Sequence, residues 1–208
     1  MDIVNWQELD LRDCDLVLCS GNGKLSKAIQ KFQKYTGAPK KSRHISHVAG
    51  IKRFGPADRY AGLQESTTKN KWCGRKGVQI NFFREWLEHY SGKVYIKQLN
   101  MCRDLTFKDF DNDFWDEHKN DKYENGIPGA LELLLCGLRL HRFVRTVFGD
   151  YNPTFTKNPH CTELQAQRLD THHLWNTLIF PNRMPPWIWW DHIDEWLTVS
   201  TKPIVRVK

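Results

Sequence analysis

The sequence has no apolar run long enough to cross a membrane, and no pair of its cysteines has CxxC spacing. A membrane-spanning helix needs about 18 or more consecutive apolar residues, so we expect no helix of this class. The six cysteines are scattered, at positions 14, 19, 73, 102, 136 and 161. Without paired spacing they indicate reduced thiols rather than a zinc site or a disulfide framework.

The N-terminal residues lack the apolar core of a secretion signal, and we therefore expect a cytoplasmic protein of cellular, viral or phage origin. Internal repeats and low-complexity linkers are also absent. The 208 residues, 40% hydrophobic and 26% charged, are enough for one sizeable core. The sequence thus predicts a single domain over residues 1–208.

Positive charge is concentrated in one stretch of a chain whose formal net charge is +7. Seven basic residues fall between positions 24 and 43: Lys24, Lys27, Lys31, Lys34, Lys40, Lys41 and Arg43. This pattern is typical of a solvated helix face followed by a basic loop. The alternative is contact with an anionic surface, either lipid headgroups or nucleic acid. No RNA-binding, helix-turn-helix or zinc-finger pattern accompanies the stretch.

Strand-like and helical segments are mixed along the chain, which predicts an α+β fold. Short apolar runs typical of strands lie at 15–19, 47–51, 63–67, 78–80, 94–99 and 204–207. Helical spacing recurs at 25–32, 82–90, 106–115, 128–147 and 161–170. We expect Asn81 to cap the helix that begins after it, and Gly37 to end the helix before it.

Cys161 is the strongest candidate for a nucleophile. Asn158 suits a helix N-cap and Pro159 the first helical position, which places Cys161 in the first turn of a helix. Unpaired backbone N–H groups and the helix dipole favour a thiolate there. The neighbouring His160 points elsewhere, because adjacent residues on a helix do not share a face.

Thiol catalysis also needs a base and a group that orients the base. His47 opens a strand-like run, and strand alternation places it on the same face as Ala49 and Ile51. Glu65 lies in the next strand-like run, where antiparallel pairing brings facing side chains to within about 5 Å. The resulting order along the chain is His47, Glu65, Cys161, whereas ordinary papain-like enzymes run cysteine, histidine, polar residue.

In these motifs and their order the chain resembles the circularly permuted branch of the NlpC-type papain-fold hydrolases, the YiiX-like group in particular. The similar segments are 15–18 with 20–29 (opening strand, glycine turn and helix), 46–51 (histidine strand), 64–67 with 77–78 (polar strand), 123–129 (tyrosine-bearing segment) and 161–164 (nucleophile motif). The chain departs from the group at Cys14, where glycine usually precedes the opening strand, and at Thr162, which replaces serine.

The resemblance implies a permuted papain-like fold, in which a small antiparallel β-barrel packs on helices and Cys161 stands at a helix N-terminus. Residues 101–120 look like an added helical insertion. The group's chemistry is acyl transfer through a thioester. The expected function is therefore a thiol hydrolase that cleaves a peptide-like amide or an ester. The alternatives are a lipid acyltransferase or deacylase of the same fold, and a non-catalytic protein that binds lipid or nucleic acid.

The remaining expectations concern the surroundings of this site. Catalytic roles are assigned to Cys161, His47 and Glu65, and substrate-binding roles to Tyr123, His160 and Ser46. We expect no cofactor and no metal, because His44, His172 and His173 match no zinc spacing. The Trp187–Trp190 cluster is expected to pack over the core, with a ligand or membrane patch as its alternative.

Overall fold

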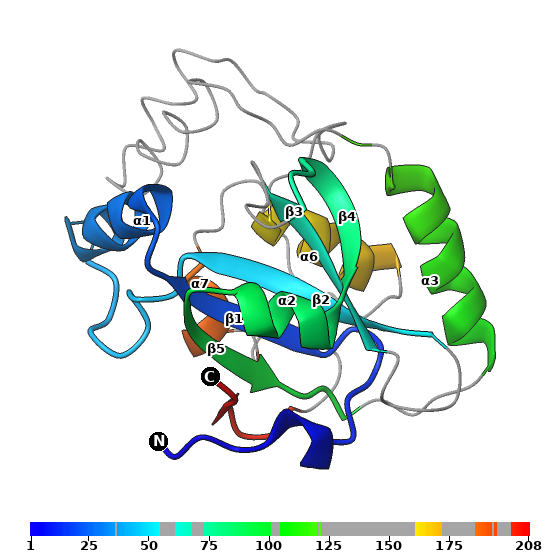
Figure 1. The fold of residues 1–208 in the computed structure, drawn as a ribbon, viewed down its shortest axis with the longest axis horizontal. Helices are drawn as coiled ribbons and strands as arrows, with labels where there is room; N and C mark the ends of the chain where they lie inside the picture. Colours follow the sequence, from blue (N-terminus) through cyan, green and yellow to red (C-terminus); the bar gives the residue numbers. More distant parts are fainter. Residues whose placement is uncertain are drawn as a thin grey trace.

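The computed structural model describes residues 1–35, 37–54, 61–67, 73–100, 105–119, 121, 161–171, 186–192, 194 and 201–208. The strands are β1 (Leu16–Gly21), β2 (His47–Arg53), β3 (Ala61–Thr67), β4 (Gly77–Phe82), β5 (Gly92–Lys97) and β6 (Val205–Arg206). The α-helices are α1 (Lys24–Tyr35), α2 (Phe83–His89), α3 (Leu105–His118), α6 (Cys161–Thr171) and α7 (Ile188–Asp191), and a 3-10 helix spans Trp6–Glu8. The presence of both helices and strands along the chain confirms the α+β prediction (Figure 1).

The six strands form one sheet in the order β4-β3-β2-β1-β5-β6, and every neighbouring pair is antiparallel. Strands from the first and last parts of the chain thus belong to the same sheet, with the first strand near its centre. Pairing among the described strands leaves β4 and β6 at the two edges. The sheet is therefore open, and the closed barrel that we expected is not observed.

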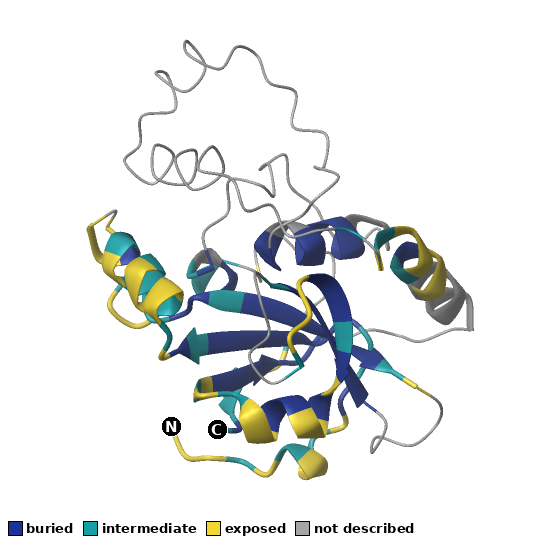
Figure 2. Ribbon diagram, turned by 45° about the horizontal axis from the view of Figure 1, so that its top comes forward, coloured by how far each residue is buried: buried dark blue, intermediate teal, exposed yellow. Residues whose placement is uncertain are grey.

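Both faces of the sheet are buried, because side chains of each central strand alternate between two cores. On one face Leu16, Leu18 and Val48 pack with Ala166 of α6 and Trp189 of α7. The other face meets α2, through the residues Val17, Cys19, Ala49, Ile51, Leu63, Phe83, Trp86 and Leu87. Figure 2 shows the resulting buried sheet, with the exposed residues gathered mainly on the helices and the chain ends.

The ladder between β2 and β3 is shorter than either strand. It pairs Gly50–Arg53 with Ala61–Gln64, whereas β3 remains paired with β4 from Gly62 as far as Thr67. The first three residues of β2 and the last three of β3 lie beyond this ladder. His47 and Glu65 belong to those ends, which pair with β1 and β4 but not with each other. Their side chains therefore lie where β2 and β3 are no longer joined.

Several local predictions can be compared with the structure. The helix expected near residues 101–120 is confirmed as α3, and the helix expected from Cys161 as α6. The capping role predicted for Asn81 is wrong: α2 begins after Phe82, and Asn81 lies inside β4. The helix expected at 128–147 lies outside the described residues. Among the helices that the structure describes, none has the length and apolar character needed to cross a membrane.

Candidate active site

Helix α6 begins at Cys161, so the thiol lies in its first turn, as the sequence predicts. Asn158 and Pro159, predicted as the N-cap and the first helical residue, lie outside the described residues. Two buried side chains of this helix fix it to the sheet. Gln165 Nε2 donates to the carbonyl oxygen of Gln64 at 3.1 Å, and Arg168 Nη2 donates to that of Ile51 at 2.8 Å. These bonds lay α6 along β2 and β3, with its N-terminal end toward the start of β2. The thiol is therefore held by regular, buried structure rather than by a loop.

His47 lies between the other two predicted site residues. Its Nε2 atom is 2.9 Å from Oε2 of Glu65, and its side chain also hydrogen bonds to Cys161. Because Nε2 is engaged by the carboxylate, Nδ1 is the ring nitrogen left for the thiol. The structure thus brings together His47, Glu65 and Cys161, which are far apart in the sequence, in the relation that a base needs with its nucleophile and its orienting group.

Two amide side chains of β4, which the sequence analysis missed, hold the carboxylate. Gln79 Nε2 and Asn81 Nδ2 each donate to Oε1 of Glu65 at 3.1 Å. Gln79 is the direct cross-strand neighbour of Glu65, and all three side chains are buried. Glu65 therefore accepts bonds on both oxygens, which fixes the direction in which Oε2 faces His47.

The electrostatics of the cluster favour a charged imidazole. Burial by itself lowers the pKa of His47. The charge and hydrogen bond of Cys161, together with those of Glu65, outweigh burial and raise the pKa to about 10. A histidine with such a pKa is an imidazolium at neutral pH, and a negative charge on Cys161 is the largest of the effects that raise this pKa. Coupled groups of this kind titrate as a pair, so the charged state belongs to both residues.

A second thiol lies beside the cluster. Cys19 of β1 is the cross-strand partner of His47 and is fully buried. Burial raises the pKa of the Cys19 thiol well above its usual value, and the negative charges of Glu65 and Cys161 raise it further. Burial likewise raises the pKa of Tyr90, whose hydroxyl hydrogen bonds to Cys19. Both groups therefore stay neutral at physiological pH, and Cys19 is a neutral neighbour of the cluster.

The substrate-binding predictions have different outcomes in the structure. Ser46 is buried, and its hydroxyl accepts from the Gly21 backbone N–H at 3.1 Å and donates to the Cys19 carbonyl oxygen at 3.4 Å. Both bonds tie the start of β2 to β1, so the hydroxyl is engaged within the fold. Tyr123 and His160 lie outside the described residues.

Two tryptophans of the Trp187–Trp190 cluster pack into the core. Trp189 is fully buried in the core under α6, and Trp190 packs edge-on against Tyr95 and His44 at centroid distances of 5.0 and 5.2 Å. This confirms the packing interpretation for these two tryptophans.

Within the described ranges, no group of three or more histidine, cysteine or acidic side chains is placed to hold a metal ion. His172 and His173 are outside those ranges.

The arrangement of these side chains can perform nucleophilic acyl chemistry. It offers a thiol at a helix N-terminus, a histidine bonded to it, and a carboxylate fixed behind the histidine. Comparison with known proteins adds no assignment: no family model matches the sequence, and no curated protein matches it.

Proposed function

We propose that this chain is a thiol hydrolase that cleaves an amide or ester bond through an acyl-cysteine intermediate. In this proposal Cys161 is the nucleophile, His47 is the general base and acid, and Glu65 orients the imidazole. Gln79 and Asn81 are positioning residues, because they act on the reaction only through Glu65.

One observation carries the proposal: His47 is bonded to Cys161 on one side and to Glu65, at 2.9 Å, on the other. A cysteine at the start of a helix is by itself more often a small core residue than a nucleophile. Here the same thiol faces a base, and the base faces an anion whose second oxygen takes two amide donors. This is the three-part arrangement that thiol catalysis needs.

The reaction follows from the positions of these groups. The Cys161 proton resides on His47, and the thiolate attacks the substrate carbonyl carbon to give a tetrahedral oxyanion. The backbone N–H of Cys161, at the start of α6, is oriented to stabilise that charge. When the carbon–nitrogen or carbon–oxygen bond breaks, His47 gives its proton to the leaving amine or alcohol. Water, deprotonated by His47, then attacks the thioester; breaking the carbon–sulfur bond releases the acid and regenerates the Cys161 thiolate beside the protonated His47.

A permuted papain-like domain is the fold interpretation that accompanies this function, and a detail at Cys14 supports it. The resemblance places Cys14 where the group usually has glycine. Cys14 has a φ of 65°, in the left-handed region that glycine enters at least cost. The backbone thus keeps a conformation suited to glycine at the position where the sequence departs from the group.

A binding protein without catalysis is the rival from another class, and the charges of the site favour the enzyme. An imidazolium and a carboxylate, 17% and 4% exposed, are costly to bury when only packing is needed. The acyltransferase and deacylase alternatives use the same thioester chemistry. They differ from the hydrolase only in the acceptor and in the acyl group, and the same first experiment addresses all three.

That experiment is the pH dependence of iodoacetamide alkylation, resolved for each cysteine by mass spectrometry in wild type and His47→Ala. Cys161 is 6% exposed, whereas Cys19 is fully buried and Cys73 is partly exposed, so Cys73 is the internal reference thiol. We expect Cys161 to react faster than Cys73 below pH 7, and to lose this advantage in His47→Ala. If Cys161 reacts no faster than Cys73 and the substitution changes nothing, the proposed function is wrong.

A further inference from the structure

Helix α1 turns two glutamine side chains toward the protein and several of its apolar side chains toward solvent. Gln33 is its one buried side chain, and its Nε2 donates to the carbonyl oxygens of Arg43 and Ile45 at 2.8 Å each. Gln30 donates to the Gly21 carbonyl oxygen at 3.0 Å. Amphipathic helices of globular proteins normally bury their apolar stripe. In α1 it is glutamine side chains that anchor the helix.

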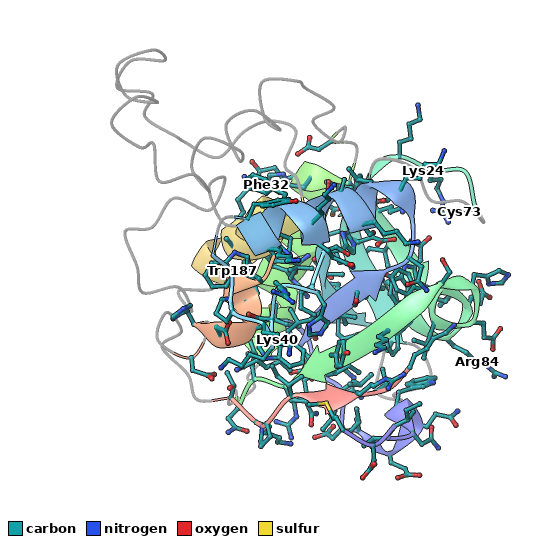
Figure 3. The ribbon with its side chains drawn as sticks, turned by 90° about the vertical axis from the view of Figure 1, so that its left-hand side faces the viewer. Lys24, Phe32, Lys40, Cys73, Arg84 and Trp187 are labelled. Carbon is teal, nitrogen blue, oxygen red and sulfur yellow. The ribbon has the colours of Figure 1, made fainter. Side chains whose placement is uncertain are left out.

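The outward side of α1 carries exposed apolar residues. Leu25 is 55% exposed and Tyr35 72% exposed, Ala28 is exposed, and Phe32 is partly exposed. With 3.6 residues per turn, these four positions fall on one continuous strip along the helix. Figure 3 views the molecule from the side on which α1 lies, with Lys24 and Phe32 labelled toward opposite ends of the helix.

A stripe of lysines runs beside this apolar strip. Lys24, Lys27, Lys31 and Lys34 recur at spacings of three and four, and all are exposed. No acidic residue occurs between Leu16 and Phe54, and none of the four lysines forms an ion pair within the part of the chain that the structure describes. The solvent side of α1 therefore combines uncompensated positive charge with apolar side chains.

An anionic lipid surface matches both properties. Amphipathic helices with lysines beside an apolar face lie in the interface of a bilayer, where the apolar side chains enter the acyl region and the lysines meet anionic headgroups. Nucleic acid would match the lysines alone, because a leucine and a tyrosine at 55% and 72% exposure add little to phosphate binding. The combination favours lipid over nucleic acid.

We propose that α1 docks this protein on anionic membranes, through Leu25, Ala28, Phe32 and Tyr35 flanked by Lys24, Lys27, Lys31 and Lys34. The helix follows the end of β1, and Gln30 bonds to the last residue of that strand. This is the end of the sheet at which β2 begins with His47. Docking by α1 would hold the candidate active site close to the lipid surface. The proposal does not depend on catalysis, since Cys161→Ala leaves α1 unchanged.

Sedimentation with lipid vesicles tests the proposal on the full chain. Two vesicle types are compared: phosphatidylcholine alone, and phosphatidylcholine with about 30 mol% phosphatidylserine. We expect binding to the anionic vesicles only, with a loss of at least about tenfold when salt rises from about 0.1 M to about 0.5 M. Cys161→Ala is expected to bind as wild type does, which separates this result from the outcome of the alkylation experiment.

Matched variants locate the docking surface. Lys27→Glu/Lys31→Glu is compared with Lys119→Glu/Lys202→Glu, which changes two exposed lysines elsewhere and lowers the net charge equally. We expect the α1 pair to lose at least about tenfold in vesicle affinity and the control pair less than about threefold. Leu25→Ser/Tyr35→Ser is compared in the same way with Ile3→Ser, a 62% exposed residue near the N-terminus. Circular dichroism checks that every variant is folded.

Three results would overturn the inference. The first is a folded wild-type protein that binds neither type of vesicle. The second is equal vesicle binding by the α1 pair and by its charge-matched control. The third is preferential binding of single- or double-stranded nucleic acid that survives Leu25→Ser/Tyr35→Ser, because a nucleic-acid surface needs the lysines without the apolar strip.

Discussion

Replacing Glu65 with glutamine removes one charge and leaves the shape of the side chain almost unchanged. The carboxylate lies 2.9 Å from His47 Nε2, with the two side chains 4% and 17% exposed. A hydrogen bond to a charged group contributes about 1.5–3 kcal/mol, which corresponds to a fall of about one to two units in the pKa of His47. Because that pKa starts at about 10, His47 stays mostly protonated below pH 7, and we expect the lost bond by itself to slow the alkylation of Cys161 mainly above about pH 8.

The amide donors of β4 add a second effect of the same substitution. Gln79 and Asn81 both point at the Oε1 position, so they would hold the oxygen of the new amide there and turn its NH₂ group toward His47. Nε2 of His47 must then accept, which leaves the ring proton on Nδ1, facing the thiol. That tautomer cannot take a proton from Cys161. In serine proteases the analogous change lowers kcat by about 10⁴, so we expect substrate turnover to fall by more than alkylation does.

A triple variant tests the tautomer argument. In Glu65→Gln/Gln79→Met/Asn81→Leu the amide is free to turn its oxygen toward His47 Nε2, and we expect part of the lost reactivity to return. The assay is the initial rate of Cys161 alkylation between about pH 5 and pH 9, against the free-cysteine reference of about 8.5. Wild-type reactivity of Glu65→Gln at every pH tested would refute the role of the carboxylate. A triple variant no more reactive than Glu65→Gln would refute the tautomer argument alone.

Three further substitutions test the surroundings of the site. Asn81→Ala removes one donor from the buried Glu65 carboxylate, and we expect urea unfolding to show a loss of about 1.5–3 kcal/mol; an unchanged midpoint would contradict this role. Gly50→Ala would place its Cβ 2.3 Å and 2.5 Å from two anchored side chains of α6, so we expect a loss of about 1–3 kcal/mol and slower alkylation of the nucleophile. Burial raises the pKa of Cys19, so this thiol should resist alkylation at pH 8, and Cys19→Ala should leave the rate at Cys161 within about twofold of wild type.

The strands could be predicted from sequence because both faces of the sheet are buried. Continuous apolar runs such as that of β1 are typical of such strands. The order of the strands could not be predicted in the same way. It places β1 between β2 and β5, and this depends on pairing between residues about thirty to eighty positions apart, which no local pattern encodes. The predicted barrel is not confirmed by the described strands, and no local pattern could have predicted this, since closure is a property of the whole sheet.

The three catalytic candidates were predictable because each has its own local signal. The roles of Gln79 and Asn81 were not predicted. Asn81 precedes a helical pattern of aromatic residues, and asparagine is also a common N-cap residue, so it was assigned to the cap. The information was nevertheless present in the alternation of β4, where Gln79 and Asn81 alternate with Val78 and Ile80. Only the register that pairs Glu65 with Gln79 shows that these amides face the carboxylate.

Stability alone does not explain the polar cluster on this face of the sheet. The neighbouring positions on the same face, Ala49, Ile51 and Leu63, are apolar and fully buried. At His47 and Glu65, by contrast, the side chains are ionisable. Replacing a buried ion pair with apolar residues of similar volume often leaves the stability of a protein unchanged or raises it. The change is confined to the ends of β2 and β3 beyond their shared ladder, where α6 delivers a thiol. Buried titratable groups with a strongly shifted pKa tend to gather at functional sites, and the position of this cluster beside Cys161 gives the shifted pKa of His47 a chemical use.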